Sequence, residues 1–84
     1  MSIHELEATT DGMAVIVGWD PPLNTFFAQV WNRSLEPDDP AAEVLWVGIA
    51  YGEIHDPEQV CDAVAPWAKV PDGLVGKLYG EAHS

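Results

Sequence analysis

The sequence predicts an α+β fold: a three-stranded antiparallel sheet, in β-β-β-α-α order, with two short C-terminal helices packed on one face. Three mostly apolar runs, at residues 13–19, 25–31 and 44–51, have the β-branched and aromatic composition of strands. Further along the chain, two stretches place their apolar residues at helical spacing. With 84 residues, 48% of them hydrophobic, the chain can build one small core, so we expect one domain.

The first two predicted strands are joined by a tight turn. Residues 13–19 are continuously apolar, which is typical of a strand with both faces at least partly covered. Pro21 and Pro22 then remove two backbone donors and fix two φ angles, so the chain turns before the next strand begins at Thr25. In that second strand one face carries Phe26, Ala28 and Val30, and the other carries Thr25, Phe27, Gln29 and Trp31. We therefore expect a hairpin.

A long loop separates this hairpin from the third strand. Residues 33–43 contain two prolines and four acidic residues, Glu36, Asp38, Asp39 and Glu43, which we call the acidic loop. We expect the acidic loop to lie on the surface. The third strand, residues 44–51, most simply pairs with the second strand to complete a meander; pairing beside the first strand is the alternative.

Two helices are expected after the sheet. The first begins at Pro57, because Asp56 is a suitable N-cap and Gln59 lies where a capping box places a polar residue. Pro66 is expected to end this helix near Ala65. Its inner stripe consists of Val60, Val64 and Trp67. The second, shorter helix is predicted from the spacing of Leu74, Val75 and Leu78.

Residues 1–12 alternate acidic and small side chains, so we expect a mobile or edge N-terminal arm, with residues 13–84 as the single α+β domain. The arm lacks the basic and apolar regions of a signal peptide, and no apolar run is long enough to span a bilayer. A single cysteine, Cys61, cannot form an internal disulfide. These features predict a cytoplasmic protein that does not bind membranes.

The charge of the chain is strongly one-sided. Fourteen Asp and Glu residues against three Lys and Arg residues give a formal net charge of −11 at pH 7. A negative surface disfavours direct binding to nucleic-acid phosphates or to an anionic membrane. It favours a protein partner with a basic surface.

No residue pattern in the chain predicts catalysis. The nucleophile-elbow, phosphate-loop, dinucleotide-binding and zinc-protease motifs are all missing from the sequence. The three histidines lie far apart and only one cysteine accompanies them, so we expect no metal site. Cys61 lies beside the inner stripe of the first helix, where a small inert hydrophobe is favoured over a nucleophile. We therefore expect no enzyme activity and no cofactor.

Aromatic and acidic residues are the candidates for binding. Trp19 and Asp20, held by the Pro-Pro turn, are suited to grip a basic or aromatic side chain; the alternative is that Asp20 caps the turn and the aromatics belong to the core. Four tryptophans exceed the needs of a core that covers one face of a small sheet. Phe27 and Trp31 share a face, which favours self-association through that face or a free sheet edge, with simple burial as the alternative. The acidic loop is either a docking surface or a solvated loop.

A distinctive pattern, GWD-x-PL-x-TFF, runs from Gly18 to Phe27, and Leu45 to Gly48 and Tyr51 to Glu53 follow it. On these residues the chain resembles a family of small, uncharacterised, acidic bacterial proteins associated with proteobacterial plasmids and integrative mobile elements. The resemblance covers about Met13 to Leu78 and departs at Pro21, where the family commonly has a basic residue. It implies accessory cargo of a mobile element and transfers no activity, cofactor or binding residue.

We expect a small, acidic, non-enzymatic module that binds another protein, with a homodimer as one form of that binding. The candidate binding residues are Trp19, Asp20, Phe27, Trp31, Glu36, Asp38, Asp39 and Glu43. The first alternative is an inhibitor whose carboxylates mimic nucleic-acid phosphates and thereby block a nucleic-acid-binding protein. The second is a small-molecule carrier or an enzyme with an unrecognised site, which requires a real pocket.

Overall fold

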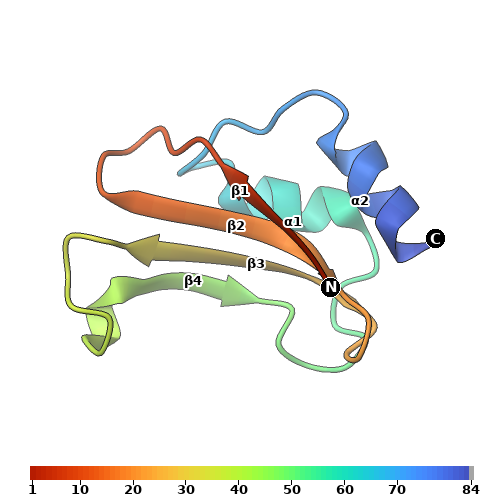
Figure 1. Cartoon of the computed structure of the whole chain (residues 1–84), viewed down its shortest axis with the longest axis horizontal. Coiled ribbons are helices and arrows are strands. Elements are labelled where there is room, and N and C mark those ends of the chain that lie inside the picture. Colours follow the sequence, from red (N-terminus) through yellow and green to blue (C-terminus); the bar gives the residue numbers. More distant parts are fainter. Residues whose placement is uncertain (84) are drawn as a thin grey trace.

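A computed structural model describes residues 1–83 and contains a four-stranded antiparallel sheet followed by two helices (Figure 1). In chain order the elements are β1 (Ser2–Leu6), β2 (Met13–Asp20), β3 (Thr25–Asn32), the 3₁₀ helix η1 (Pro40–Ala42), β4 (Glu43–Val47), α1 (Pro57–Val64) and α2 (Leu74–Ala82). The strands lie side by side in the order β1-β2-β3-β4. The α+β class, the antiparallel sheet and the two C-terminal helices are confirmed, whereas the predicted number of three strands is wrong.

The additional strand, β1, comes from the segment for which we expected an arm or an edge element. It pairs with β2 along its whole length. Only Leu6 of this strand is buried, and His4 instead forms a hydrogen bond with Glu81 of α2. Beyond β1, the Lys69 N–H donates to the Glu7 carbonyl at 3.0 Å, which ties the segment to the α1–α2 connection as well.

The last strand, β4, is shorter than predicted and ends at Val47. The next residue, Gly48, has a φ of 81°, which favours glycine, and its N–H donates to the Glu53 carboxylate at 2.9 Å. The chain nevertheless stays beside β3, because the Thr25 hydroxyl accepts a hydrogen bond from the Ile54 N–H at 2.8 Å. The pairing of β4 with β3 is the one that the predicted meander requires.

The two helices lie on the same side of the sheet (Figure 1). α1 begins at Pro57 as predicted, and the Asp56 side chain caps it by accepting from the Glu58 N–H at 2.9 Å. α2 continues to Ala82, beyond the three apolar residues that predicted it. The buried core between helices and sheet includes Val15, Val17, Phe26, Ala28, Val30, Val60, Val64, Leu74 and Leu78.

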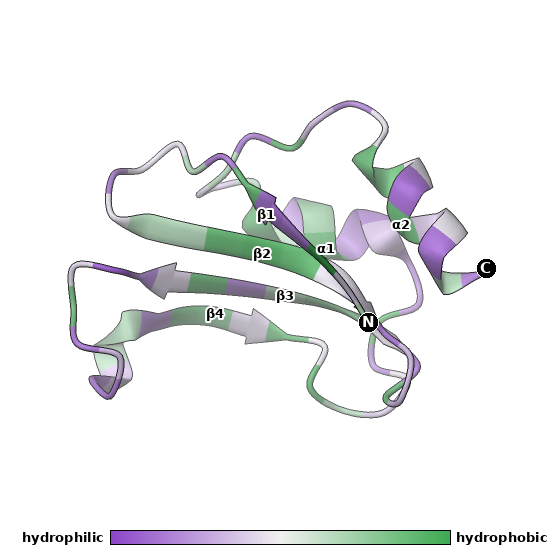
Figure 2. Cartoon of the chain, viewed as in Figure 1, coloured by the Kyte–Doolittle hydropathy of each residue, from purple (hydrophilic) through white to green (hydrophobic). Residues whose placement is uncertain are grey.

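The opposite face of the sheet is not covered by any helix formed by residues 1–83. We call it the open face. Because side chains alternate along a strand, the neighbours of the core residues point to it: Ile16, Phe27, Gln29, Trp31 and Trp46. Figure 2 shows apolar residues along β2 and hydrophilic residues at the end of β3 and in the connection to β4.

Candidate functional site

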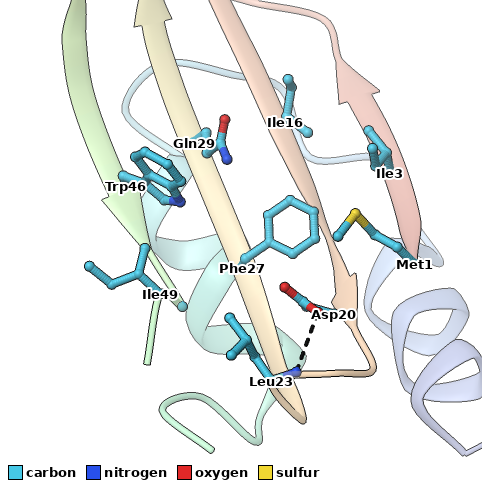
Figure 3. Close-up of a pocket in the computed structure, with 10 residues that line it drawn as sticks. Met1, Ile3, Ile16, Asp20, Leu23, Phe27, Gln29, Trp46 and Ile49 are labelled. Carbon is cyan, nitrogen blue, oxygen red and sulfur yellow. Dashed lines mark hydrogen bonds between the residues drawn. The ribbon is translucent and has the colours of Figure 1, made fainter. Parts of the chain in front are cut away.

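A groove of about 280 Å³ lies on the open face, next to the turn between β2 and β3 (Figure 3). All four strands and the segment after β4 contribute to its lining. Most of the lining is apolar, from Met1, Ile3, Ile16, Leu23, Phe27, Trp46 and Ile49. The groove is therefore the place on this face where a partner can bury apolar surface.

Phe27 forms the floor of the groove (Figure 3). The residue is only 7% exposed, although no helix of residues 1–83 covers this face. The residue opposite it on β2 is Gly18, whose missing side chain leaves room for the ring. The floor is thus fixed by the packing of one aromatic ring on a glycine of the next strand.

The walls of the groove are unusually exposed for large apolar residues. Ile3 is 62% exposed, Ile49 is 59% exposed and Trp46 is 45% exposed. In Figure 3, Ile3 lies on the β1 side of Phe27, and Trp46 and Ile49 lie on the β4 side. Contact with a partner would remove this apolar area from water, which is favourable at roughly 25 cal/mol per Å².

Asp20 supplies the one charged side chain among the described residues that line the groove. It ends β2, and its carboxylate points between Phe27 and Leu23 (Figure 3). One carboxylate oxygen accepts from the Leu23 N–H at 3.4 Å, which is a long hydrogen bond. The lining is therefore mostly apolar, and its one charged side chain, Asp20, lies beside the turn.

The indole of Trp31 links the groove to the acidic loop. Its Nε1–H donates to Oε1 of Gln29 at 2.8 Å, so the side-chain oxygen of this groove residue already accepts a hydrogen bond within the chain. Its ring centroid lies 6.0 Å from that of Trp46. On its other side, Trp31 lines a second hollow together with Glu36. The aromatic pair thus lies between the groove and the acidic loop.

The acidic loop lies at the end of β3 opposite to Asp20. Asp39 has a local structural role, because its carboxylate caps η1 by accepting from the Ala41 N–H at 2.9 Å. The remaining members, Glu36, Asp38 and Glu43, are exposed. Since Thr25 pairs with Asp20 and Trp31 pairs with Glu43, the two acidic ends are about 20 Å apart along β3 at the usual rise of a strand.

The structure separates the candidate binding residues that the sequence indicates. Asp20 and Phe27 line the groove, and Trp31 adjoins it. Trp19 lies on the helix-covered face instead, with its ring centroid 4.8 Å from that of Phe26. Asp20 therefore points to the open face, whereas Trp19 packs against the core.

Several lining residues of the groove were not indicated by the sequence, among them Ile3 and Ile49. Ile3 lies in the segment expected to be an arm, and Ile49 lies in what was expected to be the third strand. The alternation of Ile3 with polar neighbours is a signal for a strand, although five residues are too few to make it strong. No comparable signal marks Ile49, because its position depends on the loop conformation after Gly48.

Glu53 fixes that loop and hence one wall of the groove. Its carboxylate accepts from the N–H groups of Gly48 at 2.9 Å, Ile49 at 3.2 Å and Ala50 at 3.1 Å. The bonds from Gly48 and Ala50 lower the pKa of Glu53 against a smaller opposing effect of desolvation. The backbone N–H groups of residues 48–50 thus favour the ionised carboxylate, and the carboxylate in turn fixes the conformation of these residues.

Away from the groove, Glu81 and Cys61 have perturbed acidities. Desolvation raises the pKa of Glu81, but hydrogen bonds from His4 and Ser2, together with nearby positive charge, outweigh it and lower the pKa. Burial raises the pKa of the Cys61 thiol, and Asp62 and Glu58 raise it further. Both groups lie on the helix side of the sheet and neither lines the groove.

Comparison with known proteins adds no further assignment: no family model, no curated protein and no solved structure matches the chain. Within residues 1–83, no three His, Cys, Asp or Glu side chains gather closely enough to hold a metal ion. None of the helices in this part of the chain is long and apolar enough to cross a membrane.

Proposed function

We propose that the protein is a non-enzymatic interaction module whose open face binds another protein. The observation that carries this proposal is the groove, where large apolar side chains remain exposed on the face of the sheet opposite to the helices. Exposed apolar patches with polar rims are typical of protein-binding surfaces. We also propose, from the family resemblance, that the protein is accessory cargo of a mobile element.

Charge favours a partner with a basic surface. The chain carries −11 at pH 7, and its three basic residues do little to offset this on the open face. Arg33 is paired with Glu5 at 2.8 Å, and the other two, Lys69 and Lys77, belong to the helical half of the chain. A negative field of this size speeds the association of basic partners.

A second copy of the chain is the alternative partner for the open face. Within residues 1–83 no strand pairs with the outer edge of β4, so two copies joined there would extend one sheet beside the open face. The repulsion between two chains of −11 opposes such a homodimer, so we favour a different protein as the partner.

Capture from a lysate of the native host tests the proposal. The wild-type chain is compared with the Trp46→Ser, Ile49→Ser double variant and with the control Tyr79→Ser, which changes an exposed aromatic residue of α2 outside the groove. We expect a basic protein to be retained by wild type and control and lost from the double variant. Equal retention by the double variant would overturn the proposal.

The same experiment tests mimicry of phosphates by the acidic loop. A Glu36→Gln, Asp38→Asn variant removes two exposed charges without touching the groove. If the Glu36→Gln, Asp38→Asn variant fails to retain a DNA-binding or nuclease partner at every salt concentration, while the groove variant retains it, the acidic loop is the docking surface. If it retains the partner that the groove variant loses, the open face is the docking surface.

A further inference from the structure

We propose that the groove receives the side chain of a lysine or arginine from the partner protein, with the alkyl stem over Phe27 and the cation at Asp20. This inference rests on the proposed function and names the group that the open face recognises. It follows from three properties of the groove: its size, its single charge and the position of that charge.

The size of the groove suits one side chain. Its volume of about 280 Å³ is at the lower limit of the roughly 300–1,000 Å³ of pockets that hold small-molecule ligands. A long side chain laid over Phe27, between Ile3 on one side and Trp46 on the other, would contact apolar surface along most of its length (Figure 3). Lysine and arginine have such apolar stems and carry their charge at the tip.

The single charge selects a cation. Any occupant that covers the groove removes water from the Asp20 carboxylate, whose one hydrogen bond in the described chain is the long one from the Leu23 N–H. A neutral apolar side chain would leave this carboxylate buried and unpaired, which is costly. An anion would add repulsion. A cation instead replaces the lost water with an ion pair, which is strongest for the bidentate guanidinium of arginine.

The aromatic residues favour the same ligand. Phe27 forms the floor and Trp46, which is 45% exposed, forms one wall, so a cation at Asp20 lies in a groove lined by two aromatic residues. Aromatic rings attract ammonium and guanidinium groups within about 6 Å of their centroids. No basic side chain of the described chain lines the groove to compete for this position.

Three blocked tripeptides, acetyl-Leu-Xaa-Leu-amide, test the inference in NMR titrations of the full chain at low salt. Xaa is arginine, lysine or norleucine, which keeps the apolar stem of lysine and lacks its charge. We expect the arginine and lysine peptides to shift the amide signals of Phe27 and Gly48 and the indole signal of Trp46, with at least tenfold tighter binding than the norleucine peptide. Equal binding of the norleucine peptide would overturn the inference and leave the open face as a binding surface.

A pair of charge-matched variants locates the charge that is recognised. Asp20→Asn should bring the affinity for the arginine peptide down to that for the norleucine peptide. Asp38→Asn removes the same charge from the exposed acidic loop and should leave the affinity within about twofold of wild type at 0.15 M salt, where exposed charges are screened over about 8 Å. Equal losses in the two variants would show that net charge alone attracts the peptide, and would overturn the inference.

Two further outcomes are decisive. Free arginine that binds as tightly as the arginine peptide would assign the groove to a small molecule rather than to a partner's side chain, which overturns the inference. Peptides that shift none of the groove signals would also overturn it. In both cases the lysate capture with the Trp46→Ser, Ile49→Ser variant still decides the proposed function, because it does not depend on which side chain enters the groove.

Discussion

The ring of Phe27 lies directly over Gly18, its partner on the neighbouring strand. A Cβ atom placed on Gly18 would come within 2.8 Å of Cζ of that ring and would also collide with the carbonyl oxygen of Ser2 on β1. One glycine therefore allows both the close approach of the edge strand and the seating of the groove floor.

Replacing Gly18 with alanine should destabilise the fold by about 1–3 kcal/mol, because the added methyl group meets backbone that must move. Urea unfolding followed by tryptophan fluorescence measures the change. Gly76→Ala is the matched control: beyond the backbone of its own helix and its two chain neighbours, no atom lies within 4 Å of a Cβ added to this exposed glycine of α2, so the substitution should stabilise by about 0.5–1 kcal/mol. Gly18→Ala with wild-type stability would contradict the close packing of Phe27 on Gly18.

The central strands and the first helix were predictable because their signals are local. β2 and β3 follow from apolar residues bounded by a proline turn, and α1 follows from Asp56 and Pro57 at its start. β1 was not predictable in the same way. Its residue His4 faces the helices and is satisfied by Glu81, which lies 77 positions away, so the strand has a polar residue where the pattern requires an apolar one.

The groove was only partly predictable for the same reason. Asp20 and Phe27 lie in the most unusual stretch of the sequence. The alternation of side chains along β3 already places Phe27 on the other face of the sheet from Phe26. The positions of Ile3 and Ile49 depend on an edge pairing and on a loop fixed by Glu53. Such contacts between distant residues leave no periodic signal in the sequence.

The substitution Glu53→Gln should loosen the loop that carries Ile49. The neutral amide accepts weaker hydrogen bonds from the backbone than the carboxylate does. We expect faster hydrogen exchange at the amides of residues 48–50, measured by NMR, with the amides of β2 unchanged as the internal control. Unchanged exchange at residues 48–50 would show that the loop is held by other contacts.

The effect of Glu53→Gln should also depend on pH. The folded chain lowers the pKa of Glu53 below its ordinary value of 4.5, so the ionised carboxylate stabilises the loop at pH values above 4.5. This contribution is lost as the pH falls through the lowered pKa. Wild type and variant should therefore differ at pH 6 and converge in strong acid; a difference that persists there would mean that the charge of Glu53 is not its cause.

His4 and Glu81 should be energetically coupled, because the Nε2–H of His4 donates to both carboxylate oxygens of Glu81, at 2.8 and 2.9 Å. A double-mutant cycle with His4→Ala and Glu81→Gln should give a coupling free energy of about 1 kcal/mol near pH 6. The pKa of Glu81 is lowered from 4.5, so the coupling is present above pH 4.5 and disappears as the pH falls through the lowered value. A coupling near zero at pH 6 would mean that the His4–Glu81 contact does not stabilise the docking of β1 on α2.

Sedimentation velocity distinguishes the two occupants of the open face. At low ionic strength two chains, each of charge −11, repel each other, and no basic side chain of the described residues lines the groove to offset this. We therefore expect a monomer at micromolar and at near-millimolar concentration. A dimer that increases with concentration, and that Trp46→Ser dissociates while Tyr79→Ser does not, would instead assign the open face to self-association. Such a dimer would mean that burying the apolar area of Ile3, Trp46 and Ile49 stabilises the dimer by more than the repulsion between the two negative chains destabilises it. For a basic partner we propose instead that charge attraction adds to the apolar contact.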